Sequence, residues 1–278
     1  MVKTQHIITI AILFSLTSIN VSAQQFEFDK TLLYKLTYAP DSSKQASLSE
    51  EYFELFINDS VSLFRSFKKG KLDSANQIAF QNGNTFGDIS VATAYYTKFN
   101  FQIFKKDNSI SYFDYMEGHY DALFRYDEML ELNWLVMPDT KNIQGMECQL
   151  ASTNYAGRVW DAWFCKDIPI FEGPYKFSGL PGLIIKITSD DRTWDFELVN
   201  LNTNEIKRIL FNQRPELQIK NLSKKDFYKE TNYYKINKIQ IDESMGLIMF
   251  PTANDRKMMQ ANYNNHLKSH SNNIEIHP

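Results

Sequence analysis

The chain has 278 residues, a formal net charge of −3 and 14% aromatic residues, but only ten glycines. Its near-neutral charge argues against a nucleic-acid-binding protein, and we expect the basic run KKGK at 68–71 to be a solvated loop. The many Tyr and Phe residues among polar neighbours favour strands over helices.

Residues 1–23 have the pattern of a secretory signal peptide. Lys3 precedes the apolar run IITIAILFSLT, and Val21-Ser22-Ala23 supplies small residues before a cleavage site. The alternative is a membrane anchor, but the run is shorter than the roughly 20 apolar residues of a spanning helix. We therefore expect an exported protein, periplasmic or extracellular, with no transmembrane segment after cleavage. The mature chain, residues 24–278, is expected to form a single β-rich domain.

Alternation of apolar and polar residues predicts strands along most of the chain, because successive side chains of a strand point to opposite faces. Leu32, Tyr34, Leu36 and Tyr38, for example, would share one face. In chain order, the further predicted strands are 53–57, 61–67, 95–103, 110–115, 120–126, 134–137, the region 148–165, 183–187, 194–201, 234–241 and 247–250. The short polar connections between them favour antiparallel pairing.

The two cysteines frame the segment CQLASTNYAGRVWDAWFC at 148–165. If Ala156-Gly157 is a two-residue hairpin loop, Cys148 lies opposite Cys165 in a non-hydrogen-bonded pair, with Cα atoms about 4.5 Å apart. That distance is at the short end of disulfide geometry, and export favours oxidation, so we predict a Cys148–Cys165 disulfide. A three-residue loop would instead place Cys148 opposite Phe164, and two buried free thiols are the other alternative.

The run FSGLPGLIIKI at 177–187 contains one ionisable side chain, Lys186, so we interpret it as backbone architecture and not as a reactive site. Pro181 and Gly182 suit the central positions of a type II turn over residues 180–183. The structural motif comprises Gly179, Leu180, Pro181, Gly182, Leu183 and Ile184.

The segment IPIFEGPYKFSGLPGLIIKI at 168–187 resembles the one for which the GLPGLI family of exported Bacteroidetes proteins is named. Flanking pieces are also similar, namely Trp134, TKNIQGMECQLA at 140–151 and GRVWDAWF at 157–164, so the resemblance covers about residues 130–200. It implies an exported, largely β protein whose biochemical function is not established. The family supplies no catalytic residues to transfer.

Helical signals are confined to the C-terminal part. Ser223 is a candidate N-cap before KKDFYKE, and residues 255–267 are a second candidate helix, within a polar segment 253–278 that we expect to be helical or extended. His266 and His270 are four residues apart, as metal ligands on a helix would be, but no third ligand has a fitting spacing. We predict no metal and no cofactor.

The candidate ligand-binding residues are aromatic or apolar. Trp160 and Trp163 are an odd number of residues apart and should therefore lie on opposite faces of their strand, so that one of them meets a ligand, a partner or another part of the fold. Phe177 and Leu180 are the other two candidates. The sequence contains no G-x-S-x-G motif, and we assign no catalytic residues.

These features favour a large, twisted antiparallel sheet curled into a half-barrel or open barrel with one or two short helices, with a two-sheet sandwich as the alternative. The leading functional hypothesis is a non-enzymatic binding protein of the cell envelope for a hydrophobic or amphipathic ligand. The second is an interaction or assembly subunit of an outer-membrane or surface complex. A hydrolase is third, and it would require a buried Asp, Glu or His with a partner in a cleft.

Overall fold

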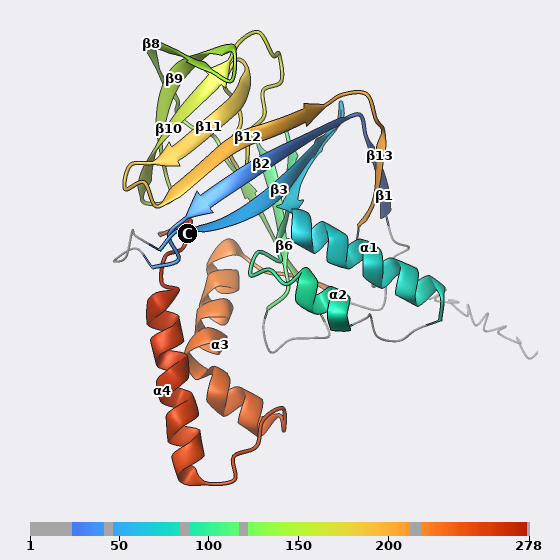
Figure 1. Cartoon of the computed structure of the whole chain (residues 1–278), viewed down its shortest axis with the longest axis vertical. Coiled ribbons are helices and arrows are strands. Elements are labelled where there is room, and N and C mark those ends of the chain that lie inside the picture. The colour runs from blue at the N-terminus through green and yellow to red at the C-terminus, as the bar shows by residue number, and fades with distance from the viewer. Residues whose placement is uncertain (1–23, 42–46, 84–88, 117–121, 212–217, 277–278) are drawn as a thin grey trace, which may run out of the picture.

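The computed structural model describes residues 24–41, 47–83, 89–116, 122–211 and 218–276. The expected signal peptide lies outside these ranges. Within them the chain forms fourteen strands and four helices (Figure 1). The strands are β1 (Gln24–Phe28), β2 (Lys30–Tyr38), β3 (Ser49–Ile57), β4 (Ser62–Ser66), β5 (Gln102–Lys106), β6 (Ser109–Asp114), β7 (Ala122–Met129), β8 (Leu135–Ile143), β9 (Met146–Tyr155), β10 (Arg158–Cys165), β11 (Leu183–Ser189), β12 (Trp194–Asn202), β13 (Lys207–Phe211) and β14 (Gln218–Asn221). The helices are α1 (Phe67–Gln81), α2 (Ile89–Ala94), α3 (Lys224–Ser244) and α4 (Ala253–Ser269).

Twelve strands form one large sheet in the order β14-β7-β6-β5-β4-β3-β2-β12-β11-β10-β9-β8. Its pairs are antiparallel except for β14 and β7, which run parallel. The sheet ends at β14 and β8 and is not closed into a barrel, while β1 and β13 form a separate two-stranded ribbon. The predicted mainly β fold with a large open sheet is confirmed, and the parallel edge strand and the ribbon are features that the alternation pattern did not predict.

The alternation of apolar and polar residues correctly predicted which face of β2 is buried. In β2, Leu32, Tyr34, Leu36 and Tyr38 are all buried on one face. Together with alternate residues of the neighbouring strands they form the main core on one side of the sheet. A smaller cluster, which includes Phe28, Phe104 and Phe211, joins the β1–β13 ribbon to the other side.

The predicted strand at 234–241 is wrong, because these residues lie inside helix α3. Ser223 caps this helix as predicted, accepting a hydrogen bond from the backbone N–H of Asp226. A capped helix satisfies its backbone locally, whereas a strand needs a partner elsewhere in the chain. The helix that begins at the Ser223 cap therefore continues through residues 234–241, although their apolar and polar residues partly alternate as in a strand.

Three further local predictions need correction. Residues 247–250 belong to the connection between α3 and α4 and not to a strand. The predicted strand 95–103 begins only at Gln102, after α2. The run KKGK is not a loop but the start of α1, where Lys69 is buried and pairs with Asp73. Residues 253–269 form α4, which includes the helix predicted at 255–267.

The hairpin of β9 and β10 has the predicted register but lacks the predicted disulfide. Ala156 and Gly157 both have positive φ, 50° and 85°, as a two-residue type I′ turn requires, and Tyr155 pairs with Arg158. Cys148 and Cys165 are nevertheless buried free thiols. The β9–β10 pairing ends at Gln149 and Phe164, one step before the cysteines, and the Cys148 thiol donates to the Met146 carbonyl oxygen at 3.6 Å.

Residues 166–182, the crossover from β10 to β11, lie across the main core face of the sheet. Lys105 of β5 donates to the carbonyl oxygen of Gly173 at 2.8 Å, and the ring centroid of Phe177 lies 4.7 Å from that of Trp160 on β10. Tyr34 of β2 donates to the carbonyl oxygen of Ile184 at 2.7 Å. The crossover therefore fills the inside of the curled sheet with its own side chains.

The two glycines of the motif have different physical roles, and the turn is not of type II. The backbone N–H of Gly182 donates to the Leu180 carbonyl oxygen at 2.8 Å, while the N–H of Leu183 reaches Ile168 instead. Gly182 has φ +155°, and a Cβ there would collide with the carbonyl group of Cys165. Gly179 has φ +88° with open space around it. Close backbone approach thus requires glycine at 182, and the left-handed conformation alone favours it at 179.

We expect Gly182→Ala to destabilise the protein by about 3 kcal/mol or more, because the backbone of Cys165 has to move. Gly179→Ala is the matched control and should cost only about 1–2 kcal/mol, the strain of a left-handed alanine. Urea denaturation followed by circular dichroism measures both values. Equal costs at the two positions would contradict this assignment of roles.

We also expect two reactive thiols per chain when the protein is denatured without reductant and titrated with a thiol reagent. In the native protein both should react slowly at pH 8, because both are buried. For Cys148 the burial, with a smaller effect of the neighbouring Cys165, also raises the pKa of the thiol to about 11. Fewer than two thiols in the denatured protein would show that the cysteines are bridged.

Candidate functional site

The four candidate binding residues occupy two different environments. Trp160, Phe177 and Leu180 are 0–1% exposed and belong to the main core. Trp163 is half-buried and lies on the other face of β10, as the odd spacing from Trp160 predicted. Of the four, Trp163 is therefore the residue that a ligand can reach.

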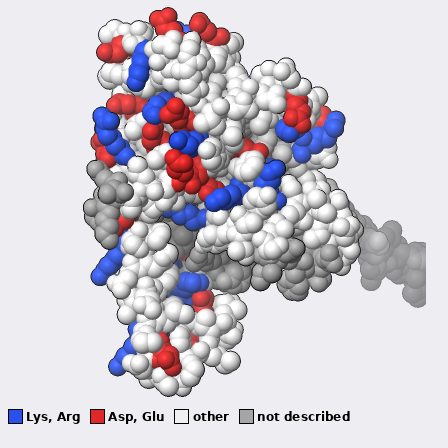
Figure 2. All heavy atoms as spheres, in the orientation of Figure 1, with Lys and Arg blue, Asp and Glu red and all other residues white. Residues whose placement is uncertain are grey.

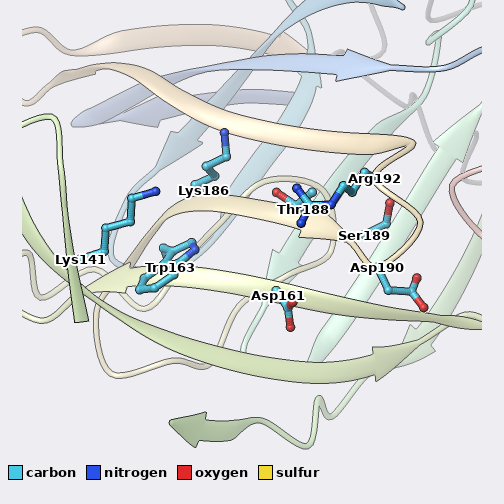
Figure 3. A pocket seen from close by; sticks show the side chains of 8 residues that line it. All are labelled: Lys141, Asp161, Trp163, Lys186, Thr188, Ser189, Asp190 and Arg192. Carbon is cyan, nitrogen blue, oxygen red and sulfur yellow. The ribbon is translucent and has the colours of Figure 1, made fainter. Parts of the chain in front are cut away.

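Trp163 lines a hollow on the outer face of the sheet, with a cavity volume of about 320 Å³ (Figure 3). The lining residues come from three strands and one turn: Lys141, Asp161, Trp163, Lys186, Thr188, Ser189, Asp190 and Arg192. The pairing of β10 with β11 brings two pairs of them together, Trp163 opposite Lys186 and Asp161 opposite Thr188. The sheet register thus assembles the floor of the hollow.

The lining residues form two groups, an aromatic end that contains Trp163 and a polar end at the β11–β12 turn. Lys141, Trp163 and Lys186 lie at one end, and Ser189, Asp190 and Arg192 lie at the other (Figure 3). The Lys141 ammonium lies 5.9 Å from the centroid of the Trp163 ring, within the range of a cation–π interaction.

Lys186 is held by two carboxylates of β12. Its Nζ atom is 3.0 Å from Asp195 and 2.8 Å from Glu197, and Asp195 also accepts a hydrogen bond from Thr188. Partial burial alone would lower the pKa of Lys186, but the hydrogen bonds that Lys186 donates to Glu197 and Asp195 outweigh it and raise that pKa. The same Lys186 contact lowers the pKa of Glu197. Both groups are therefore charged and mutually neutralised, within a surface of interspersed acids and bases over β12 and β2 (Figure 2).

The β11–β12 turn forms the polar end and is fixed by hydrogen bonds. The Asp191 carboxylate pairs with Arg158 and accepts hydrogen bonds from the Ser189 hydroxyl and the Thr193 backbone N–H. Asp190 accepts from the N–H of Asp191. These aspartates cap backbone amides, as expected for carboxylates at a turn.

A second group of polar residues centres on two side chains buried in the core, Lys176 and Glu275, and sequence reasoning missed it. The Lys176 side chain is 0% exposed, and its Nζ atom contacts Glu128 at 2.5 Å, Glu275 at 2.6 Å and the Tyr126 hydroxyl at 2.9 Å. Lys224 of α3 contacts the same two carboxylates. We call these four residues, Lys176, Glu275, Glu128 and Lys224, the buried charge cluster. Two sequence features could have indicated buried charges here, namely a lysine within the largely apolar stretch GPYKF and a glutamate between Ile274 and Ile276.

The buried charge cluster joins the two ends of the open sheet. Glu275 accepts hydrogen bonds from Tyr155 on β9 at 2.7 Å and from Lys176, which also contacts Tyr126 on β7. β7 and β9 are nine steps apart in the strand order, roughly 43 Å in a flat sheet. They can share one cluster only because the sheet curls strongly around the crossover, as a half-barrel does.

The C-terminal segment is held in place by this cluster and by neighbouring contacts. Arg158 donates to the side chain of Asn272 at 2.6 Å, and Asn272 donates to the carbonyl oxygen of Ala39 at 2.7 Å. The backbone N–H of Ile276 donates to the Ala156 carbonyl oxygen at 2.9 Å. Residues 272–276 therefore complete the core after α4.

The buried charge cluster does not supply the cleft that a hydrolase needs. The side chains of Lys176 and Glu275 are 0% and 2% exposed, and the surrounding tyrosines fill the space around them. Burial by itself raises the pKa of Glu275, but the charges of Lys176 and Lys224 and the hydrogen bonds to this carboxyl lower it to about 2. Glu275 is thus a fixed structural anion.

The two histidines considered as metal ligands stack on each other near the end of α4. The ring centroids of His266 and His270 are 4.2 Å apart, and Nδ1 of His270 contacts the backbone oxygen of His266 at 3.1 Å. Glu275, close in sequence, belongs to the buried charge cluster. Within the described ranges, no three His, Cys, Asp or Glu side chains converge as metal ligands would.

Part of the chain matches a known protein family. Residues 146–186, from β9 to the start of β11, match the family described as Protein of unknown function (Porph_ging). No curated protein shows significant similarity to the sequence.

Among solved structures, the chain is similar to PNGF-II in the P21 space group, with a TM-score of 0.51, 11% identity and 77% of this chain covered. A second PNGF-II structure, in the C2 space group, gives a TM-score of 0.48 and 13% identity over 76% of this chain. The likeness covers 34% and 33% of those chains, so this chain spans about a third of their length. At such low identity the first comparison indicates a shared fold and nothing about activity.

The charge of Glu275 should stabilise the protein in a pH-dependent way. Its pKa in the folded state, about 2, lies below the ordinary value of 4.5, so its contribution is fully present above about pH 4.5 and is lost as pH falls toward 2. We expect Glu275→Gln to cost about 3 kcal/mol or more at pH 7, because Lys176 and Lys224 lose the more deeply buried of the two carboxylates that they share and retain only Glu128.

The variant should also lose this part of the acid dependence, which denaturant titrations between pH 2 and pH 7 can measure. Glu147→Gln, at an exposed position on β9, is the control and should behave as the wild type. A Glu275→Gln variant with unchanged stability at pH 7 would contradict the structural role of the cluster.

Proposed function

We propose that this chain is an exported, non-enzymatic binding protein that takes a neutral carbohydrate in the hollow beside Trp163. The observation that carries the proposal is a half-exposed indole set among balanced polar groups of both signs. A carbohydrate is amphipathic in the sense expected from the sequence, since its rings have apolar C–H faces and polar hydroxyl edges. Export rests on the signal-peptide pattern of residues 1–23.

The aromatic end of the hollow supplies the apolar contact. The face of an indole ring carries partial negative charge, and it attracts the weakly positive C–H groups of a sugar ring as it attracts the edges of other rings. The ammonium group of Lys141, near the same ring, can donate hydrogen bonds to hydroxyl groups of a sugar placed there.

The charge balance of the hollow favours a neutral ligand. Sites for anions such as phosphate concentrate unpaired cations, usually arginines. Here Lys186 is already neutralised by Asp195 and Glu197, and Asp161 and Asp190 accompany Lys141 and Arg192 among the lining residues. Carboxylates accept hydrogen bonds and ammonium groups donate them, so the lining matches hydroxyl groups, which do both.

The same groups argue for binding over glycoside hydrolysis. A general acid needs a raised pKa, and Glu197, which lies beside the hollow, has a lowered one because of Lys186. Glu197 is therefore unsuited to donate the proton that glycoside hydrolysis requires.

Calorimetry against a panel of neutral oligosaccharides, chosen after a glycan-array screen, tests the proposal. We expect Trp163→Ala to weaken binding about 10-fold or more and Trp163→Phe to retain part of it, because the contact depends on a ring face. Phe171→Ala, at an exposed apolar residue that does not line the hollow, should bind as the wild type does.

Affinity should change little between 0.05 M and 0.5 M NaCl, whereas an anionic ligand would bind more weakly at high salt. The proposal is wrong if no neutral saccharide on the array binds, or if Trp163→Ala binds as tightly as the wild type.

A further inference from the structure

Helices α3 and α4 form a hairpin that projects away from the sheet, and residues 245–252 connect them at its free end (Figure 1). We call this connection the tip. The hairpin is held together by contacts such as the hydrogen bond from the Tyr263 hydroxyl to the Lys235 carbonyl oxygen, 2.9 Å. The tip is thus carried at a distance from both the core and the hollow beside Trp163.

The tip exposes apolar side chains to solvent. Its sequence begins MGLIMFP, seven consecutive residues without a charge. Met249 is 88% exposed, and Met245 and Leu247 are about half exposed, at 52% and 51%. Met258 and Met259, in the first turns of α4, are also exposed. Exposed apolar residues are common singly, but such a contiguous group at the end of a projection marks an interaction site.

The backbone and the carboxylates next to the tip are already satisfied. The N–H of Leu247 donates to the Asp242 carbonyl oxygen, and Thr252 and Asp255 form a capping box that begins α4. The Asp242 carboxylate pairs with Lys238 at 2.9 Å, and Glu243 pairs with Arg256 at 2.7 Å. Each acid near the tip is therefore offset by a cation or by a helix N-terminus, and none presents an uncompensated negative charge.

The hairpin is also basic in a chain that is acidic as a whole. Lys224 is neutralised within the buried charge cluster, and the remaining residues 225–269 contain seven lysines and arginines against five acids, a net charge of +2, whereas the whole chain has −3. Most of the hairpin surface visible in Figure 2 carries neither acidic nor basic side chains. The tip is apolar, and the hairpin that carries it is basic. This combination suits a lipid bilayer, which has an apolar interior and can carry anionic headgroups at its surface.

We infer that the tip inserts into the surface of a lipid bilayer containing anionic lipids, with Leu247 and Met249 entering the boundary between headgroups and acyl chains. No helix among the described residues is long and apolar enough to cross a membrane. Insertion of a few apolar side chains assisted by lysines gives a shallow and reversible attachment. It is independent of the carbohydrate proposal, because the tip and the hollow share no residue.

Vesicle flotation tests the inference, with phosphatidylcholine vesicles containing 30% phosphatidylglycerol and with phosphatidylcholine vesicles alone. Wild type should bind the anionic vesicles more tightly, and Leu247→Asp/Met249→Asp should bind them about 10-fold less. Met129→Asp is the matched control, since Met129 is 77% exposed on β7 in the sheet. All variants carry the same N-terminus, so residues 1–23 contribute equally.

A probe at the tip gives an independent readout. In Met249→Trp, the added indole should shift its emission to shorter wavelength on vesicle addition and be quenched by brominated lipid, whereas Met129→Trp should show neither effect. Circular dichroism establishes that each variant is folded.

The inference is overturned if wild type binds neither type of vesicle, or if the double aspartate variant binds as wild type does. Loss of cross-linking to an envelope protein in that variant, without vesicle binding by wild type, would also overturn it in favour of a protein partner.

Discussion

The interaction on which the rest of this structure depends is the ion pair between Lys176 and Glu275, completed by Glu128 and Lys224. It connects the crossover, the C-terminal segment, β7 and α3, which local backbone pairing does not bring together. An open sheet of twelve strands leaves its two ends apart unless something links them. Because Lys176 and Glu275 are buried, the charge of each depends on its partners, and removal of either would leave the core with unbalanced charge.

The crossover that contains the GLPGLI motif explains why the inside of the curled sheet is not an open ligand site. Tyr175, Phe177 and Leu180 are buried there, and the ring of Tyr175 packs edge to face against Phe101, with centroids 5.8 Å apart. The glycines permit this path, one because of close approach to the Cys165 backbone and one because of its left-handed conformation. The aromatic surplus that suggested an apolar ligand is therefore largely used by the fold itself.

The proposed activities consequently lie on the outside, on two surfaces that the core positions. The hollow beside Trp163 depends on the register of β10 and β11, which sets the indole opposite Lys186. The tip depends on the length of α3 and α4, which carry apolar residues away from the sheet. A protein that recognises a saccharide while resting on a bilayer would use both surfaces at once, each through side chains that the core does not need.

Most features that arise from neighbours along the chain could be predicted, although the turn over residues 180–183 and the helix at 68–71 were not. The period-two burial of β2, the two-residue loop at Ala156-Gly157 with its register, and the Ser223 cap are all local, and all were predicted. The opposite orientations of Trp160 and Trp163 likewise followed from strand geometry alone.

Only the tertiary structure decided the features that depend on contacts between distant segments. Lys176 and Glu275 are 99 residues apart, and the hollow combines β8, β10, β11 and a turn. The Ser223 cap indicated where α3 begins but not that it would extend through 234–241, and no local pattern indicated that the ladder would end before the cysteines. The physical reason is that burial and charge pairing are properties of the assembled core, whereas turns, caps and alternation are properties of short stretches of backbone.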